Sequence, residues 1–363
     1  MLNRLRLRSV LKYAGAYIAW VIGSGFATGQ EILQFFSSYG ERSLGVLAIN
    51  LIGFTALGAI LLSVGFDHKD SQDFNHYEYY CGKWIGKAYR IVIPVTLALL
   101  ISVLISAAGA TVQQYFGLNP VLGSGIMAIL ILAVYLAGFE KMVRIVSGIS
   151  PFVIVFTVFV GVVTLFRDGN TLSETETFAT LEQAHAAPHW WLSALLYLSL
   201  NFICGSTYYT ALGRAADTRE NAVAGVLVGA AAILITLATM NYAILSNARE
   251  IASYQVPTLF LARKISTVFA TLFSVILLMG MFSSCATTVW SFCSECFAKD
   301  PQKNRIFSAL VVCLCTMLGF IPFGNLMSVV YPLIGYAGLI YMAAVLWKGI
   351  TIRANRRRNT NEV

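Results

Sequence analysis

The feature that most constrains this chain is the length of its stretches without a charged residue. Eight stretches lack Asp, Glu, Lys and Arg, and they cover residues 13–30, 43–66, 91–139, 145–166, 183–213, 221–248, 265–294 and 306–347. A helix needs about 20 apolar residues to cross the hydrocarbon core of a bilayer. The stretches 91–139 and 306–347 are long enough for two helices each, and each contains turn residues, at 117–120 and 322–325. The sequence therefore predicts an all-α polytopic membrane protein with ten transmembrane helices.

Composition excludes the main alternatives to a membrane protein. The chain is 58% hydrophobic and 12% charged, whereas a soluble domain is about 25% charged. This balance excludes a soluble globular enzyme, and it also excludes a disordered chain, which would need more charge and fewer aromatic residues. No nucleophile–base set or metal cluster lies at a common depth in the predicted helices. We therefore expect neither an enzyme nor a bound cofactor.

Basic residues predict the orientation of the chain. If the N-terminus is cytoplasmic and the helix count is even, 20 of the 25 Lys and Arg residues lie on the cytoplasmic side, including those of a basic tail at 353–363. This asymmetry fits the positive-inside rule. It predicts a multi-pass protein of a bacterial-type cytoplasmic (inner) membrane with both termini in the cytoplasm. The net charge of +8 then needs no nucleic acid to explain it. The polar segment 249–264 is expected to form an external surface or re-entrant helix.

The first predicted helix carries an unusual run of glycine and polar residues. Gly23, Gly25 and Gly29 fall within seven residues, and Thr28, Gln30 and Glu31 follow or separate them. Each glycine inside a helix costs about 1 kcal/mol relative to alanine. Close helix packing through small residues is one explanation, but the spacing is irregular and the polar residues are unsuited to face lipid. We therefore predict an unwound segment in this helix.

The sixth predicted helix has a similar interruption at residues 201–206, where Asn, Gly and Ser follow an apolar run. Interruptions at corresponding positions of two halves indicate the binding site of a transporter. Five helices per half predict a single integral membrane domain built as a 5+5 inverted repeat, with repeats at about 10–167 and 188–352. The solute-binding residues expected from the two interruptions, together with one serine of the third helix, are Gly23, Ser24, Gly25, Phe26, Ala27, Asn201, Phe202, Cys204, Gly205 and Ser106.

The predicted helix layout and one stretch of the sequence resemble known protein families. The ten-helix layout with interruptions in helices one and six resembles the LeuT fold of the amino acid–polyamine–organocation superfamily. The stretch Gly-Ser-Gly-Phe-Ala-Thr-Gly-Gln-Glu at 23–31 resembles the bacterial YkvI-type membrane proteins. The resemblance implies a secondary transporter that moves a small solute, most simply an amino acid or a related zwitterion, by alternating access. The bilayer and this solute are the expected partners, and the sequence leaves the oligomeric state open.

The resemblance also implies a site for a coupling cation. In sodium-coupled relatives the ion lies between carbonyls before the first interruption and hydroxyls on the eighth helix, and the matching positions here are Ala19, Ile22, Gly280, Ser283 and Ser284. The two serines could instead hydrogen-bond to their own helix, and Thr287 and Thr288 are a competing pair. Some proton-coupled relatives carry a lysine on the fifth helix, and residues 147–166 contain no basic residue, which favours Na⁺ over H⁺.

The sequence leaves the role of Glu31 open. It is the one carboxylate close to the interruption, and an ionisable residue inside a membrane is a functional candidate. It could carry a proton, which would make the protein a proton-coupled transporter, or it could pair with an ammonium group of the solute. It could also be a solvated vestibule residue. The alternative to a transporter, from another functional class, is a non-transporting membrane sensor or structural protein with the same fold.

Overall fold

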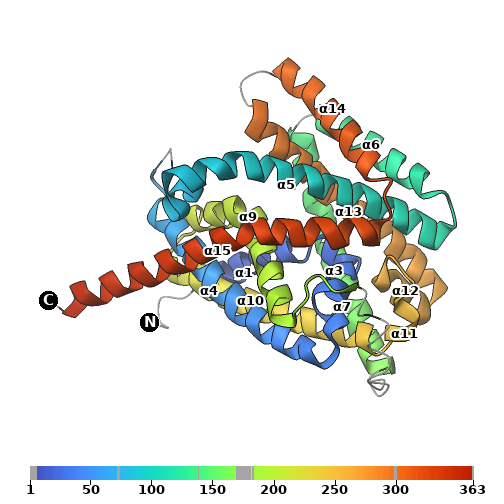
Figure 1. Ribbon diagram of the computed structural model, residues 1–363, viewed down its shortest axis with the longest axis horizontal. Coiled ribbons are helices and arrows are strands. Elements are labelled where there is room, and N and C mark those ends of the chain that lie inside the picture. The colour runs from blue at the N-terminus through green and yellow to red at the C-terminus, as the bar shows by residue number, and fades with distance from the viewer. Residues whose placement is uncertain are drawn as a thin grey trace.

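The protein is helical throughout the part that can be described (Figure 1). The structure, a computed structural model, describes residues 6–71, 74–137, 139–168, 181, 184–297 and 301–361. The helices are α1 (Leu7–Val21), α2 (Ser24–Ala27), α3 (Gln30–Phe35), η2 (Ser37–Arg42), α4 (Ser43–Asp67), α5 (His76–Phe116), α6 (Pro120–Ala137), α7 (Phe139–Asp168), α9 (Trp190–Arg214), α10 (Arg219–Leu245), α11 (Ala248–Ile251), α12 (Pro257–Ile265), α13 (Thr267–Phe297), α14 (Pro301–Leu318) and α15 (Phe323–Asn361).

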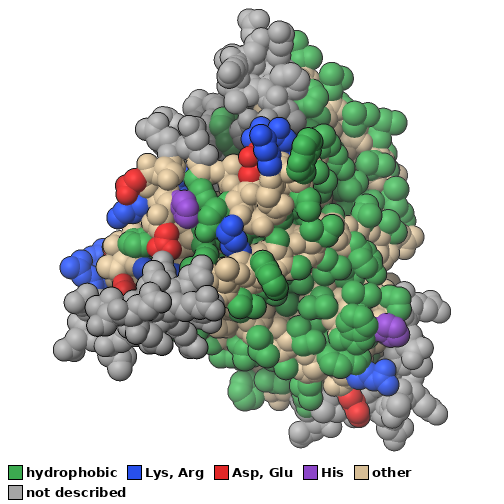
Figure 2. All heavy atoms as spheres, turned by 60° about the vertical axis from the view of Figure 1, so that its left-hand side comes forward, with side chains coloured by type: hydrophobic (Ala, Val, Ile, Leu, Met, Phe, Trp, Pro, Cys, Tyr) green, Lys and Arg blue, Asp and Glu red, His purple; other side chains and the backbone are tan. Residues whose placement is uncertain are grey.

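Length and hydropathy identify helices suited to a bilayer. Among the described residues, six segments are long and apolar enough to cross a membrane, namely Ser37–Asp67, His76–Phe116, Pro151–Asp168, Arg219–Leu245, Thr267–Cys293 and Phe323–Ile352. The segments Pro120–Leu136 and Ala309–Leu318 are apolar but shorter. Figure 2 shows hydrophobic side chains over much of one face, whereas most of the charged side chains lie in the left half of the view and a few at the lower right. The class of polytopic membrane protein predicted from the sequence fits this structure.

Both long uncharged stretches contain a turn. Between α5 and α6 the chain turns at residues 117–119, where Gly117 adopts a positive φ of 67° that favours glycine. Between α14 and α15 the turn lies at residues 319–322, three residues earlier than predicted. The reason is Pro322, which precedes the first residue of α15 and whose carbonyl accepts a hydrogen bond from the Leu326 N–H. Proline belongs at a helix start, so the helix begins at once after it.

The first helix is interrupted, as predicted. α1 ends at Val21, and Ile22 has a non-helical backbone with φ −85° and ψ 68°. Two short helices, α2 and α3, continue the path and are separated by Thr28 and by Gly29, whose φ is 79°. A Cβ atom at Gly29 would lie 2.9 Å from Cγ2 of Thr258. Glycine at this position therefore permits both the left-handed turn and the close approach of α12.

The predicted interruption of the sixth helix is wrong. α9 runs from Trp190 to Arg214 as one helix, and residues 201–206 lie inside it. The polar side chains there hydrogen-bond to their own helix, because Asn201 donates to the Tyr197 carbonyl at 2.9 Å and Ser206 donates to the Ile203 carbonyl at 3.0 Å. Gly205 serves packing, since a Cβ atom there would lie 2.5 Å from Nε1 of Trp20.

Helices from the two parts of the sequence pack in pairs. α1 contacts α10, α4 and α15 contact α9, and α5 contacts α13. In Figure 1 the start of α1 and the end of α15 lie on the left, whereas α11 and α12 lie at the right. The start of α1 and the end of α15 are therefore on one side of the molecule, and α11 and α12 are on the other.

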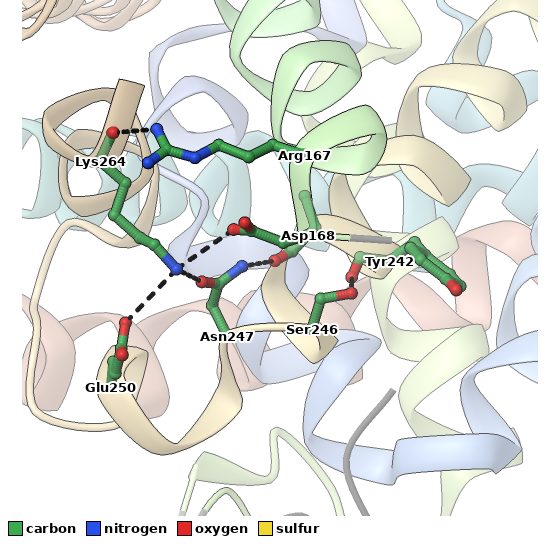
Figure 3. Close-up of polar contacts among 8 residues, drawn as sticks. Arg167, Asp168, Tyr242, Ser246, Asn247, Glu250 and Lys264 are labelled. Atoms are coloured by element: carbon green, nitrogen blue, oxygen red, sulfur yellow. Dashed lines mark hydrogen bonds and ion pairs between the residues drawn. The ribbon is translucent and has the colours of Figure 1, made fainter. Parts of the chain in front are cut away.

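A cluster of polar side chains connects α12 to α7 and α11 (Figure 3). The Lys264 ammonium lies 3.1 Å from Oδ2 of Asp168 at the end of α7 and 3.7 Å from Oε2 of Glu250 on α11. It also donates to the Asn247 side chain, and Arg167 donates to the Lys264 carbonyl. The predicted helix is thus present as α11 and α12, and the ion pair of Lys264 with Asp168 holds it against the end of α7.

Candidate functional site

The interruption of the first helix lies beside a large cavity. The cavity has a volume of about 660 Å³ and lies between α1, α5, α9, α13 and α15. Of the residues predicted to bind the solute or the cation, it is lined by Ala19, Gly23, Gly25, Glu31, Asn201, Cys204, Ser283 and Ser284. Volumes of this size accommodate small-molecule ligands. The structure therefore brings much of the predicted site together around one space.

One end of the cavity is closed around Glu31. This side chain is buried, with 8% of its surface exposed. The Tyr197 hydroxyl lies 3.5 Å from Oε2, and the Tyr331 hydroxyl also contacts the carboxylate. A Cβ atom at Gly25 would overlap with Oε1 of Glu31, so only glycine leaves room for the carboxylate here. Among the described residues, no Lys or Arg forms an ion pair with Glu31.

The other end of the cavity is open. Thr207 and Ala211 near the end of α9 and Ser291 near the end of α13 line the cavity and are exposed. Trp20 and Tyr208 form an aromatic wall between the two ends, because their rings stack with centroids 5.2 Å apart. A solute can therefore enter from the side of the α9 and α13 C-termini and travel as far as Gly25 and Glu31.

The carbonyl groups at the end of α1 are free of helical hydrogen bonds. In the described part of the chain, no backbone N–H donates to the carbonyl of Ala19 or of Ile22. The N–H of Ile22 makes the last bond of the helix, to the Ile18 carbonyl at 2.9 Å. Unpaired backbone carbonyls inside a membrane protein need a partner, and a hard cation is a suitable one.

The serine hydroxyls on α13 face the same space. Thr287 and Thr288 donate to the Ser284 carbonyl at 2.9 and 2.7 Å, and Ser291 donates to the Thr287 carbonyl. By contrast, no hydrogen bond within the described residues occupies the hydroxyl of Ser283 or of Ser284. A Cβ atom at Gly23 would lie 3.9 Å from Oγ of Ser284. The back-bonding alternative thus describes Thr287 and Thr288 but not the two serines.

Several predicted residues lie away from the cavity. Ile22 and Gly280 do not line it, and Gly280 packs against Val153 of α7. Phe26 and Phe202 are buried in the core, and Ser106 donates to the Ile321 carbonyl at 2.6 Å, at the turn before α15. Ala27 and Gly205 do not line it either. The backbone of Ser24 begins α2, and its side chain lies outside the described residues.

Two hydroxyl groups around Glu31, those of Tyr331 and Tyr197, were not predicted from the sequence. Tyr331 precedes Pro332 within α15, and a tyrosine–proline pair inside an apolar helix was the available signal. Tyr197 lies on α9 one turn before Asn201, in the region where a helix break was expected. Both tyrosines are far from Glu31 in the sequence, so no local pattern indicates that they contact it.

The side of the interruption opposite the open mouth is closed by α12. The Thr258 hydroxyl donates to the Ala27 carbonyl at 2.6 Å, and the Thr258 N–H donates to the Thr28 carbonyl at 3.1 Å. Gln114 of α5 binds both backbone groups of Val256, at 2.8 and 2.9 Å. Nearby, the side-chain oxygens of Gln30 and Gln34 are buried without a hydrogen-bond partner. Hydrogen bonds and buried apolar residues, among them Leu259 and Leu261, therefore close this side together.

Comparison with known proteins agrees with this picture at the level of the fold. No family model matches the chain. The chain is 26% identical over 353 residues to the uncharacterized membrane protein YkvI of Bacillus subtilis, covering 97% of this chain and 98% of that protein. It is 22% identical over 341 residues to the uncharacterized protein YyaD of the same organism, covering 93% of this chain and 96% of that protein.

Solved structures of a manganese transporter from Eremococcus coleocola are similar in fold. A histidine-to-alanine mutant of that transporter matches with a TM-score of 0.54 at 12% identity, covering 94% of this chain and 78% of that chain. The same transporter in complex with an aromatic bis-isothiourea compound matches with a TM-score of 0.54 at 14% identity, covering 93% and 78%. The chain thus shares the fold of a membrane transporter.

Proposed function

We propose that this protein is an ion-coupled secondary transporter of a small solute that works by alternating access. The observation that carries the proposal is a cavity that is open at one end and closed at the other beside an interrupted helix. Such interruptions expose backbone groups that can bind a solute and an ion while the rest of the helix still crosses the membrane. In this proposal the chain forms one membrane domain of ten helices in a 5+5 inverted repeat, and the structure corresponds to its inward-open state.

Na⁺ is the coupling ion that the site supports best. The carbonyl of Ala19 and the hydroxyls of Ser283 and Ser284 belong to residues that line the cavity, and they have no other partners among the described residues. Carbonyls freed by an interrupted helix coordinate Na⁺ in transporters. One Na⁺ entering down about 100 mV releases about 2.3 kcal/mol, and a tenfold gradient adds about 1.4 kcal/mol. Together these can drive an accumulation of a neutral solute of several hundred-fold.

The cavity favours a zwitterion as the solute. Its described lining contains one carboxylate, Glu31, and no Lys or Arg. Glu31 can receive an ammonium group, while the peptide and hydroxyl groups near Gly25 can receive a carboxylate. A dianion would find no basic side chain in the described lining. An amino acid or a related zwitterion meets both requirements.

The test is uptake by purified protein in proteoliposomes, with and without an inward Na⁺ gradient. A panel of labelled amino acids is the first set of solutes, and Mn²⁺ is a separate arm because a transporter of similar fold carries manganese in its name. We expect uptake of at least one amino acid that depends on Na⁺. No uptake and no thermal stabilisation by any solute of the panel would favour the sensor or structural alternative.

The burial of Glu31 supports a second candidate, a proton-coupled transporter. A buried carboxylate whose described partners are tyrosine hydroxyls is costly unless a cation or a proton neutralises it. If a proton does so, Glu31→Gln abolishes uptake driven by a pH gradient while solute exchange persists. If Na⁺ drives uptake and Glu31 receives the ammonium group of the solute, the same variant needs more solute for half-maximal uptake but retains its dependence on the Na⁺ gradient.

A further inference from the structure

A second hollow lies on the outside of the helix bundle, away from the proposed solute pathway. It is a groove of about 380 Å³ between α5, α13 and α14, and all the described residues that line it are apolar. Its walls include Ile91, Val95 and Leu99 of α5, Phe292 of α13, and Leu314 and Leu318 of α14. The lining of this groove offers no polar side chain to a soluble metabolite, and it suits a hydrocarbon chain.

The groove faces the surroundings of the protein. Ile91 is 72% exposed, Leu314 is 62% exposed and Val95 is 54% exposed. α5 is one of the helices suited to cross a membrane, and exposed apolar side chains on such a helix contact lipid. Lipid acyl chains are therefore the hydrocarbon available to fill this groove.

The end of the groove is marked by an aromatic and a basic residue on the same helix face. The backbone of α5 departs from helical geometry at Gly82, so residues 83–116 form one continuous register. Positions three, four and seven apart share a face of a helix. Trp84 and Lys87 lie seven and four residues before Ile91, and Val95 follows four residues after it. Lys87 therefore lies about 6 Å beyond Ile91 along the helix axis.

The charge of Lys87 is available to a ligand. In the described part of the chain neither Lys87 nor Lys83 forms an ion pair. The next basic residue, Arg90, differs, because its guanidinium lies 2.9 Å from Oε1 of Glu78. Trp84 is 85% exposed beside them, and tryptophan prefers the level of the lipid headgroups. A free ammonium at headgroup level, directly above an apolar groove, is complementary to an anionic lipid.

We propose that this groove binds an anionic phospholipid of the bilayer, with one acyl chain between α5 and α14 and the phosphate on Lys87. Basic residues beside grooves between transmembrane helices recognise anionic headgroups. A zwitterionic lipid could place its chain in the groove but gains little from Lys87. The inference depends on the membrane location of α5 and not on the proposed transport function.

The test is lipid retention by the full-length protein in nanodiscs that contain equal amounts of phosphatidylglycerol and phosphatidylcholine. Lipids that remain bound after extraction into detergent are counted by native mass spectrometry. We expect phosphatidylglycerol to be enriched on the wild-type protein. Lys87→Gln should lower this enrichment about fivefold, which is the effect of about 1 kcal/mol for one basic residue near a membrane surface. Ala98→Phe, which fills the groove, should remove the retained lipid whatever its headgroup.

Two matched variants serve as controls. Lys69→Gln removes another exposed lysine, and Ala231→Phe adds the same side chain to an exposed position on α10, outside the groove. Both should retain phosphatidylglycerol as the wild type does. Unchanged enrichment in Lys87→Gln together with unchanged retention in Ala98→Phe would overturn the proposal, and so would an equal loss in Lys69→Gln. Melting temperatures in the two lipids give a second readout, with a stabilisation by phosphatidylglycerol that Lys87→Gln loses.

Discussion

At the scale of single residues, the hydroxyl groups of Ser283 and Ser284 are set apart from their neighbours on α13. Thr287, Thr288 and Ser291 all donate to carbonyls of the same helix, which is the usual behaviour of such residues in membrane helices. Within the described residues, the two serines keep their hydroxyls free, and they line the same cavity as Ala19, whose carbonyl is unpaired. Free oxygen atoms from two helices around one cavity are the kind of ligand that a cation site uses.

We predict that Ser283→Ala and Ser284→Ala each weaken Na⁺ binding by about 10- to 100-fold, because each removes one oxygen from a charged partner. The measurement is the Na⁺ concentration that gives half-maximal uptake, or half-maximal thermal stabilisation. Thr288→Val is the control, since its hydroxyl is already bound to the Ser284 carbonyl at 2.7 Å. Equal sensitivity to Na⁺ in all three variants would exclude the serines as ligands.

Gly25 offers a second prediction at this scale. A Cβ atom there would overlap with the Glu31 carboxylate and lie 2.7 Å from the Tyr331 hydroxyl. Gly25→Ala should therefore displace Glu31, destabilise the protein by about 1–3 kcal/mol and abolish uptake. The matched control is Gly15→Ala in α1, where a Cβ atom meets nothing within 4 Å. That variant should be as stable as the wild type or up to about 1 kcal/mol more stable, and apparent melting temperatures compare the two.

At the scale of the elements, the interruption of the first helix could be predicted from the sequence, whereas the sixth helix was misjudged. In the first helix, Gly23, Gly25 and Gly29 combine low helix propensity with polar neighbours, so local chemistry is enough to break the helix. In α9, Asn201 donates to its own backbone, Ser206 bonds to its own backbone and to the Tyr77 hydroxyl of α5, and Gly205 makes room for Trp20 of α1. The use of that glycine depends on a residue 185 positions earlier in the chain, which no local pattern can reveal.

The candidate site shows the same contrast between features that the local sequence indicates and contacts between residues far apart in the sequence. Ala19, Ser283 and Ser284 could be placed at the cavity because matching positions of a known fold were carried over, and Gly23 because the glycine run marked the interruption. Tyr197 and Tyr331 were missed since tyrosines at helical spacing look like ordinary core residues. Ser106 does not line the cavity, and its hydroxyl donates instead to the Ile321 carbonyl, in a turn far along the chain.

α12 provides a prediction for a whole element. Thr258→Val keeps the shape of the side chain but leaves the buried Ala27 carbonyl without its donor. An unsatisfied buried acceptor costs about 1–3 kcal/mol, so the contact of α12 with the interruption should weaken and the apparent melting temperature should fall. Ser253→Ala, whose hydroxyl donates to the Glu250 carbonyl on the exposed surface, should leave it unchanged. A loss of similar size in both variants would mean that the Thr258 bond contributes nothing specific.

At the scale of the whole molecule, the start of α1 and the end of α15 lie on one side and α11 and α12 on the other (Figure 1). Combined with the placement of the basic residues, this arrangement predicts cytoplasmic termini and an external α11–α12 segment. The loop between α4 and α5, which contains Ser71, should then be cytoplasmic.

We predict that Ser253→Cys reacts with a membrane-impermeant maleimide on intact cells, and that Ser71→Cys reacts only after the cells are permeabilised. Both positions are exposed, so accessibility alone does not separate them. The unsubstituted protein, with its own cysteines, gives the background. The reverse labelling pattern would invert the orientation and turn the open mouth of the cavity to the outside.

The way in which α12 closes the interruption also has a thermal consequence. Thr258, Gln114 and Lys264 hold it through hydrogen bonds and ion pairs, and such contacts exchange for contacts with water when the segment moves. The same segment also buries Val256, Leu259 and Leu261 in the hydrophobic core. Moving it away hydrates this apolar surface, and apolar hydration is the main source of a positive heat-capacity change. The arrangement with α12 displaced should therefore have the higher heat capacity, and the logarithm of the balance between the two arrangements should curve with inverse temperature.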